Sequence, residues 1–183
     1  MHASGVLVDI EVAGTPVRAP VRPIVYKFAD PAFGELRRPV AAVPAVTVLL
    51  ESHIEFLPAD SPVSRIVRVA LRSASDRERT VRVSLQLPAG LRADSASRTV
   101  TLRPRGAASV AFTVRGSLPP GSTRFGAVAT SEGEQFTVGY TPIEYEHIAP
   151  QQLYRPAVTS LAAVDVRLPA GLNVAYIPGV GDN

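Results

Sequence analysis

The chain has 183 residues, 46% of them apolar, which is enough for one ordinary domain with a hydrophobic core and some additional chain. It contains no cysteine, so a disulfide framework, a zinc ribbon, a thiol nucleophile and a CxxC redox pair are excluded. The net charge is only +3, and the basic residues, nearly all arginines, are scattered singly, so we expect no nucleic-acid partner.

Residues 1–42 predict two strands and a connector. Apolar residues recur at 6–12 and 21–28, and the turn sequence AGTP at 13–16 follows the first of these predicted strands. Residues 30–44 are rich in proline, which lacks a backbone donor and is unfavourable inside a sheet. We therefore expect an irregular connector there.

Residues 43–141 show the period-two alternation of half-buried strands. Val67, Val69 and Leu71 are expected to face a core, while the polar or small residues between them face solvent. Strands are predicted at 46–50, 67–72, 80–87, 100–102, 109–115, 125–130 and 136–140. Proline- and glycine-rich turns separate them, and helical periodicity is absent. These features predict an all-β chain with a central immunoglobulin-like antiparallel β-sandwich and additional flanking strands.

The last part of the chain predicts a linker and the start of a different domain. Residues 142–172 are expected to form a polar, aromatic linker that contains an alternating strand at 163–168. The apolar run 173–177 leads into GVGD at 179–182, as a buried parallel strand leads into a glycine-rich loop. Residues 173–183 are therefore expected to be the truncated first strand of an α/β domain.

The chain has three histidines, and two of them have acidic neighbours. Glu51, His53 and Glu55 would share one face of a strand and could hold a metal ion there, although an exposed edge strand explains the same pattern. In EYEH at 144–147, the histidine would point away from both carboxylates. No motif for a nucleophile elbow, a zinc protease, a phosphate loop or a calcium loop occurs. We predict no catalytic, cofactor-binding or metal-binding residue in this chain.

Aromatic residues make up only 6% of the sequence and include no tryptophan, which disfavours a platform for sugar rings. Phe112, Phe136 and Tyr140 fall on inward strand positions and are expected in the core. Aromatic residues outside the sandwich are better suited to contacts between domains. The candidates for such contacts are Tyr145, His147, Tyr154 and Tyr176.

Residues 1–5 lack the features of a signal peptide, and no apolar stretch is long enough to span a membrane. We therefore expect no membrane span, and either a cytosolic chain or an export signal encoded further upstream. The terminal strands at 6–12 and 163–177 lack obvious neighbours in the sequence. Because unpaired apolar strands seek partners, we expect these two segments to pair with one another or to drive self-association.

Several stretches of the chain carry a family resemblance. Residues 26–39 (YKFADPAFGELRRP) and 43–48 (VPAVTV) resemble the region that follows the catalytic domain in large members of the PIG-L (LmbE-like) deacetylase family. Three shorter motifs follow at 87–91 (LPAGL), 102–106 (LRPRG) and 110–114 (VAFTV). Together they resemble the NEW3-type immunoglobulin-like domain.

Three motifs near the end resemble the junction into a glutamine-amidotransferase-like α/β domain of the same proteins. They are 143–148 (IEYEHI), 153–157 (LYRPA) and 175–182 (AYIPGVGD). The resemblance implies an extracytoplasmic parent protein that removes N-acetyl groups from an N-acetylglucosamine-type substrate with zinc. The family's metal motifs have no counterpart in this sequence, so the zinc and the active site are expected outside this chain.

The sequence thus favours a non-catalytic β-sandwich spacer, or interdomain-contact module, whose partners are neighbouring domains of one polypeptide. Two other functions stay open at this point. One is a carbohydrate-binding accessory module with a glycan as its partner, since β-sandwiches often carry such sites. The other is an adhesion or assembly domain.

Overall fold

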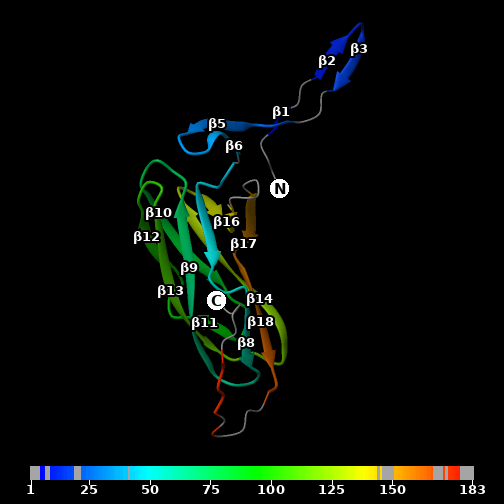
Figure 1. Ribbon diagram of the computed structural model, residues 1–183. Helices are drawn as coiled ribbons and strands as arrows, with labels where there is room; N and C mark the ends of the chain where they lie inside the picture. Colours follow the sequence, from blue (N-terminus) through cyan, green and yellow to red (C-terminus); the bar gives the residue numbers. More distant parts are fainter. Residues whose placement is uncertain are drawn as a thin grey trace.

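Two packed β-sheets form the body of the molecule (Figure 1). This computed structural model describes residues 5–6, 9–18, 22–40, 42–143, 145, 151–166, 171 and 173–177. All the regular elements assigned in these ranges are β-strands. The same residues contain no helix that is long and apolar enough to cross a membrane. The predicted all-β, immunoglobulin-like sandwich is therefore confirmed.

The smaller sheet has the strand order β11-β13-β9-β7, and the larger has the order β12-β10-β14-β18-β8, with β15 beside β14. The smaller sheet consists of β7 (Val46–Leu50), β9 (Val63–Ser73), β11 (Leu91–Ala93) and β13 (Ala107–Gly116). The larger consists of β8 (Ile54–Pro58), β10 (Arg79–Gln86), β12 (Arg98–Leu102), β14 (Gly121–Ser131), β15 (Glu134–Phe136) and β18 (Val158–Val164). Neighbours are antiparallel except β8 and β18, which run parallel.

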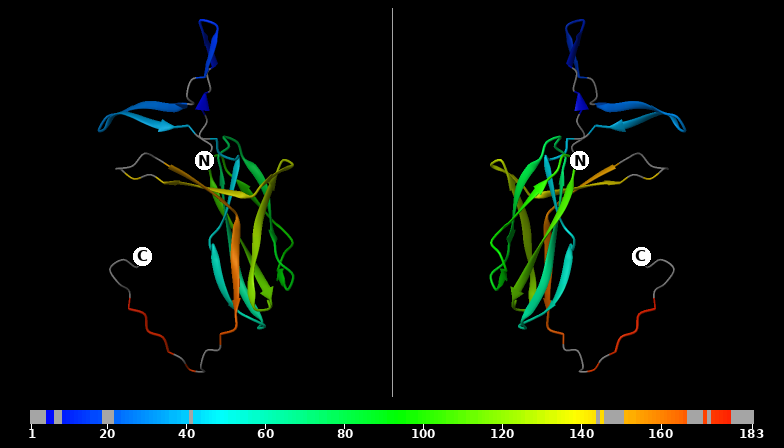
Figure 2. Two further views of the ribbon diagram at one scale, coloured as in Figure 1. Left: turned by 90° about the vertical axis from the view of Figure 1, so that its right-hand side faces the viewer. Right: turned by 90° about the vertical axis from the view of Figure 1, so that its left-hand side faces the viewer.

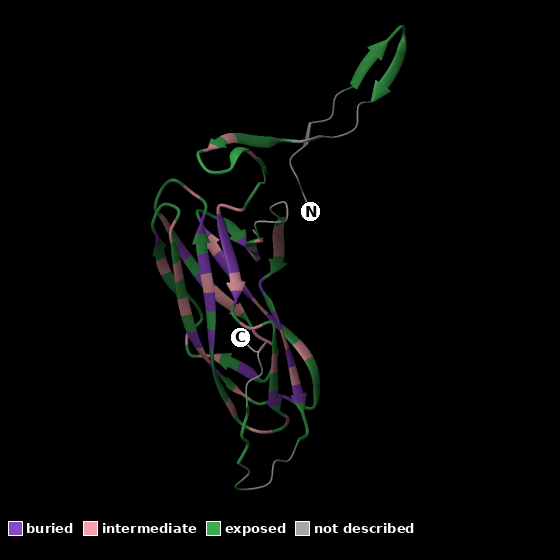
Figure 3. Ribbon diagram, in the orientation of Figure 1, coloured by how far each residue is buried: buried purple, intermediate pink, exposed green. Residues whose placement is uncertain are grey.

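Alternating side chains of these strands create the core between the sheets. In β9, Val67, Val69 and Leu71 are at most 6% exposed, whereas Arg68 between them is exposed. Figure 3 shows the same alternation along the other long strands. Phe112 of β13 is fully buried at the centre. Each large apolar side chain buried in this way stabilises the fold by roughly 1.5–3 kcal/mol.

The chain changes sheets between β7 and β8. Strand β7 pairs with β9, and after residues 51–53 the chain joins the opposite sheet, where β8 pairs with β18. Glu51 and His53 therefore lie in the crossing segment, and Glu55 lies on β8. The predicted common strand face for these three residues is wrong, because the chain leaves the extended ladder before His53.

Strand β18 lies inside the larger sheet, between β14 and β8. Its Leu161 is 3% exposed and belongs to the core. The sandwich thus includes a strand beyond residue 141, where the sequence predicted its end. The alternating strand expected at 163–168 lies at 158–164 instead, because the small residues there pack inward between the sheets.

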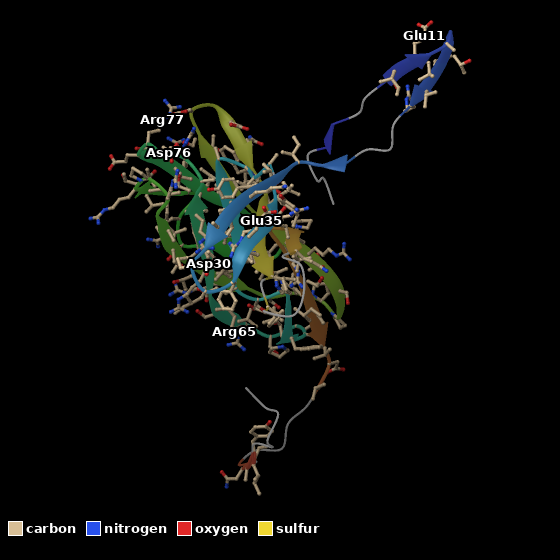
Figure 4. The ribbon with its side chains drawn as sticks, turned by 45° about the horizontal axis from the view of Figure 1, so that its top comes forward. Glu11, Asp30, Glu35, Arg65, Asp76 and Arg77 are labelled. Atoms are coloured by element: carbon tan, nitrogen blue, oxygen red, sulfur yellow. The ribbon has the colours of Figure 1, made fainter. Side chains whose placement is uncertain are left out.

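The amino-terminal flank is built from antiparallel hairpins. β2 (Asp9–Val12) pairs with β3 (Thr15–Arg18), β5 (Val25–Asp30) pairs with β6 (Gly34–Pro39), and the short β1 (Gly5–Val6) pairs with β4 (Arg22–Pro23). The expected irregular connector at 30–44 therefore contains a strand. Figure 4 shows Glu11 on β2 far from the sandwich, whereas Glu35 belongs to the hairpin nearer to it.

The flanks are attached at opposite ends of the sandwich (Figure 2). The upstream end contains the start of β7 and the loops that follow β9 and β12, and the downstream end contains Pro58 and Val164, where β8 and β18 end side by side. Beyond the downstream end, residues 173–177 form no strand, and Val174 and Ile177 are 80% and 89% exposed. The expected buried parallel strand is not formed, since such a strand needs cover on both faces and the described residues provide none.

Candidate functional site

The upstream end carries a hairpin that contacts the segment leading into the sandwich. Strand β16 (Val138–Ile143) pairs with β17 (Gln151–Pro156), and the hydroxyl of Tyr154 donates a hydrogen bond of 2.9 Å to the carbonyl of Ala42. The rings of Tyr154 and Tyr140 are neighbours, with centroids 5.5 Å apart. Tyr154, predicted as an interdomain contact, therefore joins the hairpin to the chain that arrives from the amino-terminal flank.

The hairpin lies directly on β7. A Cβ atom at Gly139 would overlap the side chain of Leu49 and approach the carbonyl of Val48 to 2.8 Å. Only a residue without a side chain permits this close approach. The backbone of β16 is thus fixed against the edge of the smaller sheet.

The other predicted contact residues do not gather at one place. Tyr145 lies between β16 and β17 and is 63% exposed, whereas Tyr176 lies in the tail beyond the downstream end and is 72% exposed. His147 lies outside the described residues.

His53 contacts an arginine rather than forming a metal site. Its Nε2 atom lies 3.0 Å from Nη1 of Arg155 on β17. A guanidinium only donates, so Arg155 is the donor of this bond and Nε2 the acceptor. Throughout the described ranges no three His, Cys, Asp or Glu side chains come together in a way that could hold a metal ion.

Four exposed arginines share the outer face of the smaller sheet, which we call the arginine face. They are Arg68 and Arg72 of β9, Arg92 of β11 and Arg115 of β13. Small or hydroxyl-bearing residues occupy most of the positions between them, and no ion pair joins any of the four to another described residue. This face could not be recognised in the sequence, where its four arginines are spread over three separate strands.

A hollow of about 170 Å³ borders the arginine face at the upstream end. Arg72 and Thr47, which are paired on neighbouring strands, line it together with Tyr140 of the hairpin. The other lining residues are Val43, Ser73, Ala74 and Arg105. The charge of Arg105 is matched by Asp76, whose carboxylate lies 2.7 Å from its Nε atom.

Two carboxylates lie at the margins of the arginine face. Glu51 follows β7, and its backbone N–H donates a bond of 3.4 Å to the carbonyl of Arg68. Asp94 follows β11 and pairs with Arg98 at 3.0 Å. Desolvation raises the pKa of the Asp94 carboxyl, but hydrogen bonds from Thr113 and the charge of Arg98 outweigh it and leave this pKa below its ordinary value. Asp94 is therefore ionised and neutralised by Arg98, not by the four face arginines.

No family model and no curated protein matches this sequence. Solved structures with similar folds include WR4, a C. elegans member of the MSP family, with 12% identity and a TM-score of 0.35; the match covers 66% of this chain and 98% of that one. The PapD-like domain 7 of human CEP192 matches 74% of this chain and 97% of its own, with 13% identity and a TM-score of 0.34.

A much larger protein, E. coli alpha-2-macroglobulin, matches 81% of this chain with 15% identity and a TM-score of 0.46. The match covers only 9% of that protein. At such low identities and TM-scores these likenesses carry no information about function.

Proposed function

We propose that this chain is a non-catalytic β-sandwich spacer and interdomain-contact module of a larger, extracytoplasmic polypeptide of the PIG-L deacetylase type. The observation that carries the proposal is the attachment of the flanking segments at opposite ends of the sandwich (Figure 2). A module attached in this way separates its neighbours by its own length. The 11-residue strand β9 sets that length at about 35 Å.

Contacts at the upstream end support the interdomain role. The hydrogen bond from Tyr154 to Ala42 and the close packing of Gly139 on Leu49 hold the hairpin against the arriving chain. A junction fixed by such contacts sets the orientation of the adjoining domain as well as its distance. The zinc ion and the hydrolytic residues implied for the parent protein would belong to its catalytic domain, and no step of that chemistry is assigned to this chain.

A titration tests the absence of catalysis and of neutral glycan binding. Chitooligosaccharides, which carry no carboxylate, would be titrated calorimetrically into the 183-residue chain with zinc present, and acetate release would be measured in the same samples. We expect neither heat of binding nor acetate. Saturable binding without acetate would favour the carbohydrate-binding alternative, and zinc-dependent acetate release would contradict the proposal.

Spin-label distances test the spacer role directly. The chain lacks cysteine, so Arg103→Cys at the upstream end and Ser122→Cys at the downstream end would provide unique labelling sites. We expect one narrow distance distribution near 35 Å, set by the length of the long strands, in the chain alone and with adjoining domains attached. A broad or split distribution would show a flexible module, which cannot act as a spacer.

A further inference from the structure

We propose that the arginine face binds a linear polysaccharide that carries carboxylate groups. This inference goes beyond the spacer role and does not depend on which domains adjoin the sandwich. Arg92 and Arg115 are directly opposite each other on neighbouring antiparallel strands, an arrangement of like charges that disfavours the folded state. An anion bound between them would relieve this repulsion.

The spacing of the arginines calls for an extended ligand. Arg68 and Arg72 are four residues apart on β9, which separates their backbones by about 13–14 Å. Arg115 pairs with Ser64, a further four residues along the same strand. The charged positions thus form a row of roughly 27 Å along a sheet, longer than a small anion can span.

The residues between the arginines fit a sugar chain. Ala70, Ala107 and Ala111 are small and leave the sheet surface open to close approach. Ser64 and Ser109 occupy positions between them and provide hydroxyls that both donate and accept hydrogen bonds. Ile66, which is 59% exposed, lies between Arg68 and Ser64 and adds an apolar surface to the face. The hydroxyl of Thr113, opposite Ile66, is bound to the Asp94 carboxylate. Guanidinium groups match planar carboxylates through two parallel N–H···O bonds. Alternating charge and hydroxyl recognition is what a carboxylated polysaccharide requires.

The hollow at the upstream end gives the ligand a defined terminus. Its volume of about 170 Å³ and the presence of Tyr140 and Arg72 among its lining residues suit one sugar ring with one carboxylate. The strand positions of the arginine face itself carry no aromatic side chain. Single-stranded nucleic acids bind by stacking successive bases on such rings, so the face favours a glycan over a nucleic acid.

Binding of polygalacturonate tests the inference, with its methyl-esterified form as an uncharged control on the same backbone. The test variant is Arg68→Gln/Arg115→Gln, and the matched control is Arg82→Gln/Arg124→Gln, which removes two exposed arginines from the outer face of the larger sheet. At low ionic strength we expect saturable binding to the wild-type chain. The test variant should bind about 3- to 30-fold more weakly and the control within about twofold, given the usual strength of exposed ion pairs.

Four outcomes would overturn the inference: no binding by the wild-type chain, equal binding of the methyl ester, equal weakening in both variants, or tighter binding of a single-stranded oligonucleotide. The variant Arg68→Lys/Arg115→Lys provides a folded, charge-retaining comparison, in which loss of the planar fork should weaken binding less than the glutamines do. Thermal unfolding of every variant shows whether its fold is intact. Failure of binding leaves the spacer proposal untouched, since that proposal requires no ligand.

Discussion

Gly139 shows how a single residue fixes the hairpin of the upstream end. Its missing side chain lets β16 lie against Leu49 and the Val48 carbonyl on β7. Gly139→Ala should therefore destabilise the chain by about 1–3 kcal/mol, the usual cost of forcing extra volume into a packed contact. Equilibrium denaturation in urea measures this free energy of unfolding.

Gly126→Ala is the matched control for that substitution. Gly126 lies on β14, and its added Cβ would meet its nearest neighbour, the Ala157 carbonyl, at 3.4 Å, close to ordinary contact. We expect the control to change the free energy of unfolding by less than about 1 kcal/mol, since it needs little displacement. Equal destabilisation by both substitutions would mean that the hairpin is not packed tightly on β7.

At the residue scale, the sequence predicted buried positions better than polar contacts. Phe112 and Phe136 were expected in the core and are at most 5% exposed, because burial follows from the local period-two pattern. Tyr140 was expected there as well but is only half-buried, because the chain leaves the larger sheet after Phe136 and β16 pairs with β17 instead. The bonds from Tyr154 to Ala42 and from Arg155 to His53 join residues more than a hundred positions apart. No local pattern encodes such pairs, since they depend on how the hairpin folds back onto the sheet.

Among the elements, β18 was the hardest to assign from sequence. Its residues VTSLAAV alternate only weakly in polarity, and a polar stretch precedes them, so they resembled a linker. Their place in the sheet depends on β14. Residues 126–130 of β14 pair with β10, and its residues 121–126 pair with β18. Strands β6 and β8 were missed for a related reason: charged residues and prolines obscure their alternation.

Truncation of Leu161 tests whether β18 belongs to the sandwich in solution. Leu161 is 3% exposed between the sheets, so Leu161→Ala should lower the free energy of unfolding by about 2–5 kcal/mol. Val164→Ala, on the same strand but 36% exposed, should cost less than about 1 kcal/mol. If the two variants unfold at the same denaturant concentration, β18 is not a core strand.

The arginine face also arises at the level of elements. Outward positions could be assigned strand by strand, because arginine and core valine alternate in β9. The face itself required the order β11-β13-β9-β7, which places residues from different parts of the chain beside one another. Hydrophobic periodicity and strand propensity do not determine the order of strands in a sheet. Arginines that are scattered along the sequence therefore become neighbours only in the folded chain.

For the whole molecule, the structure changes the expectation about the terminal segments. Residues 9–12 pair with β3 rather than with the end of the chain, and residues 158–164 pair inside the sandwich. The predicted pairing of the two terminal segments with each other is therefore wrong for the described residues. Self-association stays a prediction, and its best-placed element is now β8, an edge strand on which Ile54 and Phe56 are 62% and 69% exposed.

Hydrogen exchange should resolve the molecule into a stable body and a weakly stable amino-terminal flank. β9 and β13 each have a neighbour on both sides, whereas β2 and β3 pair only with each other and all their side chains are exposed. An isolated two-stranded hairpin is marginally stable in water. We expect amides of β9 and β13 to exchange at least about a thousandfold more slowly than those of β2 and β3. The reason is that core amides exchange only through global unfolding, whereas a weak hairpin opens at almost no cost in free energy.

The same measurement at two protein concentrations separates intrinsic stability from association. A flank that is stable only through its own hairpin exchanges at a rate independent of concentration, because no second molecule takes part in its opening. Strong protection of β2 and β3 at both concentrations would contradict the expected weakness of this flank. Protection of β8 or the flank that rises with concentration would instead show strand pairing between copies of the chain, through the edges that the sandwich leaves open.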